Sequence, residues 1–150
     1  MRRHLLALIA AGLLFGCGAI DTYNPKLIGN GGTFRLAANP PQNNVTAGNT
    51  VTYTVTGTSE GPFNSPVSLS ASGLPQGATA SFNPNPITPT PNGTDSTLTI
   101  NTGGNLNGTI KSVHRGAGAS RATYIITITG SGGGVTASTT VQLNVSLNED

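Results

Sequence analysis

The chain has no tryptophan, a single cysteine and few charged residues, since only 8% of its 150 residues are Asp, Glu, Lys or Arg. An average soluble domain carries roughly 25% of such residues. A lone cysteine excludes a disulfide scaffold and a cysteine-based zinc module. No acidic or basic tail is present, which argues against a charged nucleic-acid binder. The polar surface must come from Thr, Ser and Asn, which suit strands and turns better than helices.

The first sixteen residues predict an export signal. A basic start at 2–4 precedes an apolar run over 5–15, which is too short to span a bilayer as a helix but suits the core of a signal peptide. The run ends in Leu14-Phe15-Gly16-Cys17, which resembles the bacterial lipoprotein signal, where a leucine and a small residue before the cysteine guide lipid attachment and cleavage. The resemblance implies a lipoprotein acylated at Cys17, with palmitate as the expected kind of acyl chain. The alternative is a plain secretory signal with a chance cysteine.

Lipid attachment would fix the location and the charge of the mature protein. A diacylglyceryl group and an N-acyl chain on Cys17 anchor a protein stably at a membrane without spanning it. Cleavage also removes two of the seven basic residues, and the five that remain balance five acidic residues. A formally neutral mature chain lacks the charge that a nucleic-acid partner requires. We therefore expect membrane attachment through Cys17, envelope or surface proteins as further partners, and no nucleic acid.

Composition divides the chain after the signal into two parts. Residues 17–32 are rich in Gly and Asn and predict a flexible tether with a root-mean-square span of roughly 20 Å. Residues 33–148 are expected to form one folded domain that faces the periplasm or the exterior. Gly18 follows the cysteine in place of an aspartate, which resembles sorting to the outer membrane where the organism has one.

Short runs of alternating apolar and polar residues fill the domain. The clearest case is 50–56, where Val51, Tyr53 and Val55 are expected to face a core while the threonines face water. Similar runs lie at 34–38, 67–71, 78–82, 98–100, 124–128 and 135–147, with Gly and Pro between them, and 130–134 is expected to form a flexible turn. No stretch has the apolar spacing of an amphipathic helix. About seven strands indicate an all-β, antiparallel two-sheet sandwich.

Several of these runs resemble a bacterial immunoglobulin-like domain. The resemblance is carried by Gly73-Leu74-Pro75 with Gly77, by Phe82 with Pro84, and by 98–100, 124–130 and 141–145. It implies an immunoglobulin-like β-sandwich that serves as a non-catalytic extracellular module for spacing, adhesion or assembly. It also implies that the hydroxyl of Tyr124 caps a loop.

The segment 101–121 departs from that pattern, because such domains usually have a short link there. It contains Lys111, His114 and Arg115, the only basic cluster of the mature domain. One interpretation is a solvated hairpin extension. The other is a loop that contacts a ligand, either an anion, a glycan or a lipid headgroup.

Residues suited to catalysis are few. His114 is the only histidine after the signal and has no acidic residue within fifteen positions. Of the five carboxylates, Glu60 and Asp95 are the pair that lies inside the domain, and both are expected to be surface charges. No convincing set of metal ligands or cofactor motif is present. Phe63 is the one aromatic ring expected to be exposed, which argues against a strong glycan binder. The sequence therefore predicts no enzyme, no metal and no cofactor.

Overall fold

The computed structural model describes residues 31–103 and 121–146. These residues form eight strands: β1 (Thr33–Asn39), β2 (Gln42–Thr46), β3 (Thr50–Glu60), β4 (Ser68–Ser72), β5 (Thr79–Asn83), β6 (Thr94–Asn101), β7 (Arg121–Gly132) and β8 (Val135–Ser146). Within these ranges there is no helix long and apolar enough to cross a membrane.

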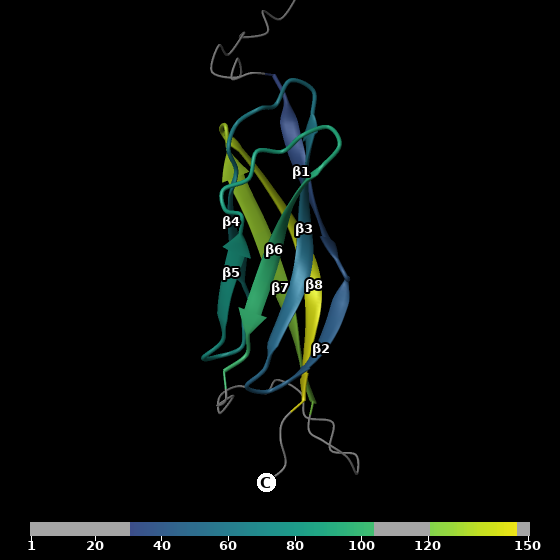
Figure 1. Cartoon of the computed structure of the whole chain (residues 1–150), viewed down its shortest axis with the longest axis vertical. Coiled ribbons are helices and arrows are strands. Elements are labelled where there is room, and N and C mark those ends of the chain that lie inside the picture. The colour runs from purple at the N-terminus through teal and green to yellow at the C-terminus, as the bar shows by residue number, and fades with distance from the viewer. Residues whose placement is uncertain (1–30, 104–120, 147–150) are drawn as a thin grey trace, which may run out of the picture.

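The strands form two four-stranded sheets packed face to face, as Figure 1 shows. One sheet has the order β1-β3-β6-β5 and the other has the order β2-β8-β7-β4. Three strands of the second sheet, β8, β7 and β4, and all four of the first follow the strand order of an immunoglobulin domain. The prediction of an immunoglobulin-like sandwich is confirmed, with eight strands where about seven were expected.

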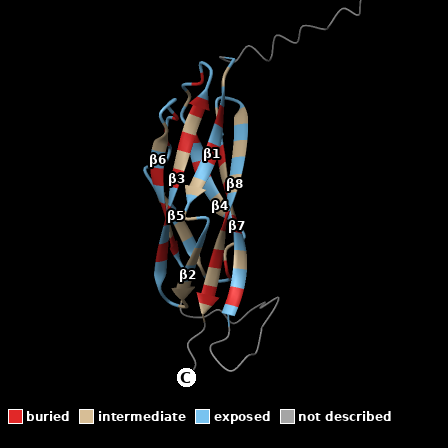
Figure 2. Cartoon of the chain, turned by 90° about the vertical axis from the view of Figure 1, so that its right-hand side faces the viewer, coloured by how far each residue is buried: buried red, intermediate tan, exposed pale blue. Residues whose placement is uncertain are grey.

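Alternating burial along each strand explains why these segments form strands. In β3, Val51, Tyr53 and Val55 are buried and the threonines between them are exposed or only partly buried, as predicted. The stripes of Figure 2 show the same period-two pattern across both sheets. Burying one face of each strand between the sheets supplies the main stabilising free energy, because apolar area is removed from water there.

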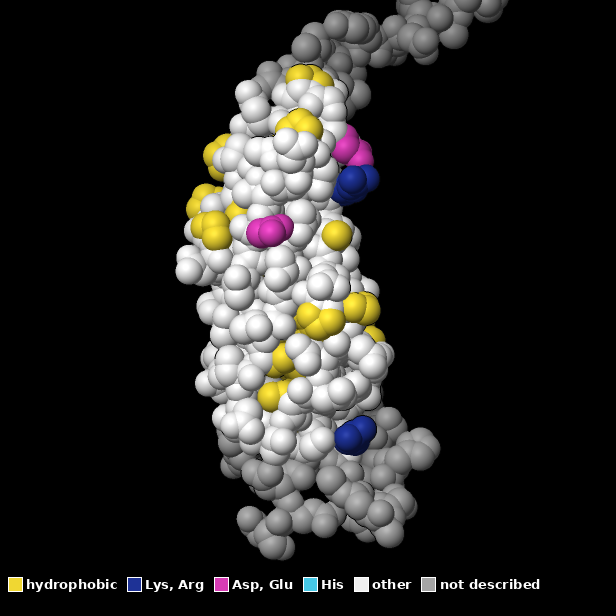
Figure 3. All heavy atoms as spheres, turned by 45° about the vertical axis from the view of Figure 1, so that its right-hand side comes forward, with side chains coloured by type: hydrophobic (Ala, Val, Ile, Leu, Met, Phe, Trp, Pro, Cys, Tyr) yellow, Lys and Arg dark blue, Asp and Glu magenta, His cyan; other side chains and the backbone are white. Residues whose placement is uncertain are grey.

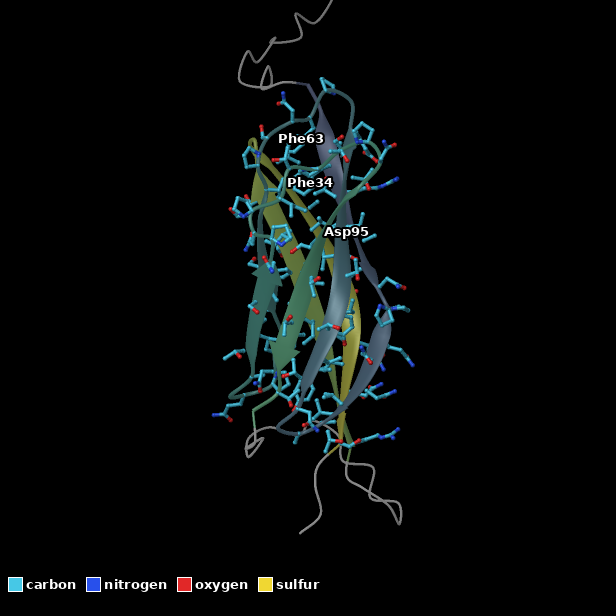
Figure 4. All side chains as sticks on the ribbon, viewed as in Figure 1. Phe34, Phe63 and Asp95 are labelled. Atoms are coloured by element: carbon cyan, nitrogen blue, oxygen red, sulfur yellow. The ribbon has the colours of Figure 1, made fainter. Side chains whose placement is uncertain are left out.

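Phe63 corrects one expectation. Its ring is buried, and it lies 5.1 Å from the ring of Phe34 with an angle of 44° between the ring planes. Figure 4 shows the two rings together at the end of the sandwich where β1 begins. Tilted aromatic pairs at this distance are favourable. The Gly-Pro turn before Phe63 suggested exposure, but it folds the ring back over the end of the core.

Strand β2 is an element that the sequence analysis missed. After Pro40 and Pro41 the chain leaves the first sheet, and the amide of Gln142 donates to the carbonyl of Pro41 at 2.8 Å, where pairing with β8 begins. β2 runs parallel to β8, whereas every other strand pair is antiparallel. Its sequence, with Val45 as the only apolar residue, shows no alternation of its own.

The last hairpin is tighter than predicted. Residues 130–132 belong to β7, and only Gly133 and Gly134 form the turn. Position 130 inside the strand requires glycine, because a Cβ atom there would come within 3.1 Å of the side chains of Val67, Leu36 and Phe34. When only the sequence is read, a glycine required by such a close approach looks like a turn residue.

Different segments of the chain reach the two ends of the sandwich. Thr33 pairs with Glu60 at one end of β3, and Asn101 pairs with Thr50 at the other. These ends are about 33 Å apart along the strand. In Figure 1 the chain enters β1 at the upper end, and the described residues next to 104–120 lie at the lower end.

Candidate functional site

The site residues singled out from the sequence lie outside the described residues. These are Cys17, the candidate lipid attachment site, and the candidate ligand contacts Lys111, His114 and Arg115. The structure therefore gives the position of their neighbours only. Gly31 lies at the end of the sandwich where β1 begins, and Gly103 and Arg121 lie at the opposite end.

The two carboxylates of the domain are not brought together. Asp95 is opposite Thr56, whose hydroxyl donates to its carboxylate at 2.6 Å. Glu60 lies on β3, four residues beyond Thr56, so it is about 13 Å along the strand from the position of Asp95. It forms an exposed ion pair with Arg35 at 3.6 Å. Paired acids in glycoside hydrolases are roughly 5–9.5 Å apart, so the expectation of two separate surface charges agrees with the geometry.

Tyr53 is the one buried titratable side chain whose pKa is shifted among the described residues. Burial raises its pKa to about 12, because the phenolate form is poorly solvated there. Its hydroxyl donates to the backbone carbonyl of Gln142 at 2.9 Å, which joins β3 of one sheet to β8 of the other. Tyr53 therefore links the two sheets. The predicted capping bond of Tyr124 is absent within the described ranges, where its hydroxyl has no hydrogen-bond partner.

The polar groups inside this part of the chain are satisfied. No buried side-chain nitrogen or oxygen of the described residues lacks a hydrogen-bond partner. No three His, Cys, Asp or Glu residues gather there in a group able to hold a metal ion. Ser96, for example, donates to the carbonyl of Pro84 at 2.7 Å, and Thr102 donates to that of Asn49 at 2.8 Å. These buried hydroxyls hold loops in place and leave no polar atom aimed at a ligand.

The outer faces of both sheets carry few charges and are rich in hydroxyl and amide groups. On the second sheet, Asn144 accepts hydrogen bonds from Thr123 and Gln142 and donates to Asn44. Figure 3 shows one side of the molecule, where charged side chains are few and apolar ones are scattered. The largest exposed hydrophobic side chain is Ile125, 56% exposed on β7. Such faces lack the aromatic platform that sugars favour and the charge that anions favour.

Edge strands are the remaining contact surfaces, and one of them is closed by a side chain. β4 lies at an edge of the second sheet, where unpaired backbone groups would attract other strands. The amide side chain of Asn85 accepts from the amide of Leu69 at 2.9 Å and donates to its carbonyl at 3.0 Å. Val67 and Ile87 exchange two backbone hydrogen bonds beside it. The segment after β5 thus covers the edge of β4.

No family model and no curated protein matches this sequence. Among solved structures, domains 4 and 5 of the S-layer protein SbsC are similar to it over 73% of this chain and 50% of that one, with 20% identity and a TM-score of 0.43. The chain thus spans half the length of that structure. The CooA pilin subunit from enterotoxigenic Escherichia coli is similar over 78% of this chain and 99% of that one, with 12% identity and a TM-score of 0.44. A family 123 glycoside hydrolase from Clostridium perfringens is similar over 77% of this chain and 27% of its own, with 11% identity and a TM-score of 0.41. These likenesses concern the fold alone.

Proposed function

We propose that this chain is a lipid-anchored, non-catalytic immunoglobulin-like module of the bacterial cell envelope, acting in spacing, adhesion or assembly. Cys17 carries the lipid, and the tether 17–32 holds the sandwich away from the headgroups. The domain faces the periplasm or the exterior, and the outer membrane is the expected anchor site where one exists.

The observation that carries the proposal is the polarity of the sandwich. The chain enters the domain at Thr33, and the segment next to Asn101 leaves it about 33 Å away at the opposite end. A lipid on Cys17 therefore attaches to one end and leaves the other end and the strand edges accessible to partners. The separated carboxylates and the satisfied polar interior support a scaffold, since function on such sandwiches resides in surface sites.

Membrane fractionation and intact mass test the anchor. The full chain and its Cys17→Ala variant are expressed in a bacterium, and each is separated into membrane and soluble fractions. We expect the wild type to be cleaved before Cys17, to carry the mass of acyl chains and to sediment with membranes. We expect none of these three results for the Cys17→Ala variant. A soluble wild type of unmodified mass would overturn the anchor and leave an exported module.

A second candidate function is ligand binding by the segment 101–121. The described residues beside it, Gly103 and Arg121, lie at the end away from Thr33, which favours a ligand outside the anchoring membrane over that membrane's own headgroups. Replacing 104–120 by a short Gly-Ser link tests it. Binding to an anion or glycan array that disappears while the circular dichroism spectrum is retained supports this function. Binding that is equal in both proteins contradicts it.

A further inference from the structure

Strand β8 has a partner on only half of one edge. It runs from Val135 to Ser146 and pairs with β7 over its whole length. On its other side β2 pairs with it only from Gln142 onward, and no other strand of the described residues follows β8 in that sheet. Residues 135–141 therefore form a strand edge without a hydrogen-bonded partner strand among the described residues, called here the β8 open edge, although β1 of the other sheet lies close to β8.

The inward side chains of β8 are less buried near its beginning, where β2 does not pair with it. The inward residues Val141, Leu143 and Val145 are at most 2% exposed. Val135 and Ala137 point to the same side of the strand and pack against the core, but they are only partly buried. A strand beside the open edge would bury them further.

The backbone groups that point into the open edge follow from the hydrogen bonds of β2. The amide of Gln142 donates to Pro41, and the carbonyl of Ser146 accepts from Ala47. Even-numbered residues of β8 therefore direct their N–H and C=O groups away from β7. The β7–β8 register is continuous without a bulge, so residues 136, 138 and 140 do the same along the open edge.

Three of the other sheet edges, those of β4, β1 and β5, are protected. Asn85 closes the edge of β4, β1 carries the ion pair of Arg35, and the short strand β5 is followed at once by Pro84. Charge, proline and short length are the usual means by which proteins prevent strand pairing. The β8 open edge has none of them, since 135–141 contains no charge and no proline and includes three β-branched threonines.

We propose that two copies of this chain associate by antiparallel pairing of their β8 open edges about a two-fold axis at Ser138. This inference rests on the proposed assembly role and names the partner. Ser138 lies opposite its own copy, and Thr136 lies opposite Thr140 of the second copy. Each of these pairs exchanges two backbone hydrogen bonds, because these residues direct both groups into the edge.

The two-fold geometry also favours a second copy as the occupant. Antiparallel pairing about Ser138 carries the second copy's Gln142 and its β2 beyond Val135, away from the first copy's β2. Uncharged threonines and serines meet like residues, which is compatible with a self-complementary interface. Such a contact is small, so we expect weak association in solution.

Cysteine cross-linking in the full chain tests the register. In Ser138→Cys the paired Cα atoms would be about 5.5 Å apart, within the range for a disulfide. Thr136→Cys is the matched control from the same strand and face, because its two copies would be about 13 Å apart. We expect a disulfide-linked dimer for Ser138→Cys in the oxidising envelope and none for Thr136→Cys. Co-expressing Thr136→Cys with Thr140→Cys should restore the dimer.

A charge variant gives a second measurement. Ser138→Lys places two ammonium groups opposite each other at the axis, where like charges repel. Ser138→Lys is introduced into both the Thr136→Cys chain and the Thr140→Cys chain before they are co-expressed. We expect it to lower the yield of the cross-linked dimer at least tenfold. Thr54→Lys, exposed on β3 of the other sheet, should leave the yield unchanged.

The outcomes separate this inference from the lipid anchor. Equal cross-linking of Ser138→Cys and Thr136→Cys overturns the pairing, as does a dimer formed instead by Ser81→Cys on β5. A Ser138→Cys adduct with a chain of different mass also overturns it, in favour of another protein. If the wild type forms a dimer through a Cys17 disulfide, the lipid anchor is overturned instead. The same cysteine variants in a Cys17→Ala background then still test the β8 open edge.

Discussion

Replacing Tyr53 by phenylalanine removes one hydroxyl from the interior and leaves the shape of the core unchanged. The hydroxyl donates to the carbonyl of Gln142 at 2.9 Å across the two sheets. A typical hydrogen bond contributes about 0.5–1.5 kcal/mol net, and the carbonyl of Gln142 still faces β2 in the parallel ladder when the hydroxyl is removed. We therefore expect Tyr53→Phe to lower the free energy of unfolding by about 0.5–1.5 kcal/mol at pH 8. The corresponding fall in Tm is about 3–8 °C for a domain of this size.

The same variant should change the response to alkali. Burial raises the pKa of Tyr53 to about 12 from the ordinary value of 10.0, so the folded state holds the phenolic proton more tightly than the unfolded chain does. This contribution to stability is fully present below pH 10 and is lost as the pH rises from 10 towards 12. Two pKa units correspond to about 2–3 kcal/mol. Tyr53→Phe should lack this part of the alkaline loss.

Urea unfolding followed by far-ultraviolet circular dichroism, repeated between pH 8 and pH 11.5, measures both effects. Tyr124→Phe is the matched control, since Tyr124 is only partly buried and its hydroxyl bonds to no described residue. We expect that variant to stay within about 0.5 kcal/mol of the wild type. A Tyr53→Phe protein as stable as the wild type at pH 8, with the same alkaline slope, would refute the reasoning.

Three further substitutions test the packing by the same unfolding assay. Phe63→Ala should cost about 3 kcal/mol or more, because it empties a buried ring site; a change below about 0.5 kcal/mol would instead indicate an exposed ring. Gly73→Ala should cost about 1–3 kcal/mol more than Gly134→Ala, because both have φ near +80° but only the first places a Cβ 2.3 Å from a β7 carbonyl oxygen; equal costs would contradict the clash. Asn85→Ala should cost about 1–3 kcal/mol by uncovering the edge of β4, whereas its exposed neighbour Asn83→Ala should be nearly neutral, and the reverse order would contradict the edge-closing role.

The candidate site was only partly accessible to sequence reasoning. The alternation around Tyr53 predicted that its side chain points inward, but its carbonyl partner lies 89 positions away on the other sheet, and no local pattern encodes that contact. Likewise Asn85 carries no sign that its amide closes the edge of a strand sixteen residues earlier. The anchor at Cys17 and the basic cluster at Lys111, His114 and Arg115 remain predictions, since they lie outside the described residues.

Local sequence patterns are enough to predict the class of the fold. Period-two alternation with β-branched residues, as at 50–56, specifies which face of a strand is buried, because each one-residue step reverses the side chain. Gly and Pro between the runs set the number of strands to within one. These are local properties of the backbone, so they can be read from neighbouring residues.

The arrangement at the edges and the ends of the sandwich depends on contacts between distant segments of the chain. β2 pairs with β8, the ring of Phe63 packs against that of Phe34, and position 130 of β7 requires glycine because side chains of β1 approach it. Each depends on residues distant in the chain, so local alternation carries no signal for it. The same pairing that creates β2 stops at Gln142 and leaves the β8 open edge, which the sequence alone does not reveal.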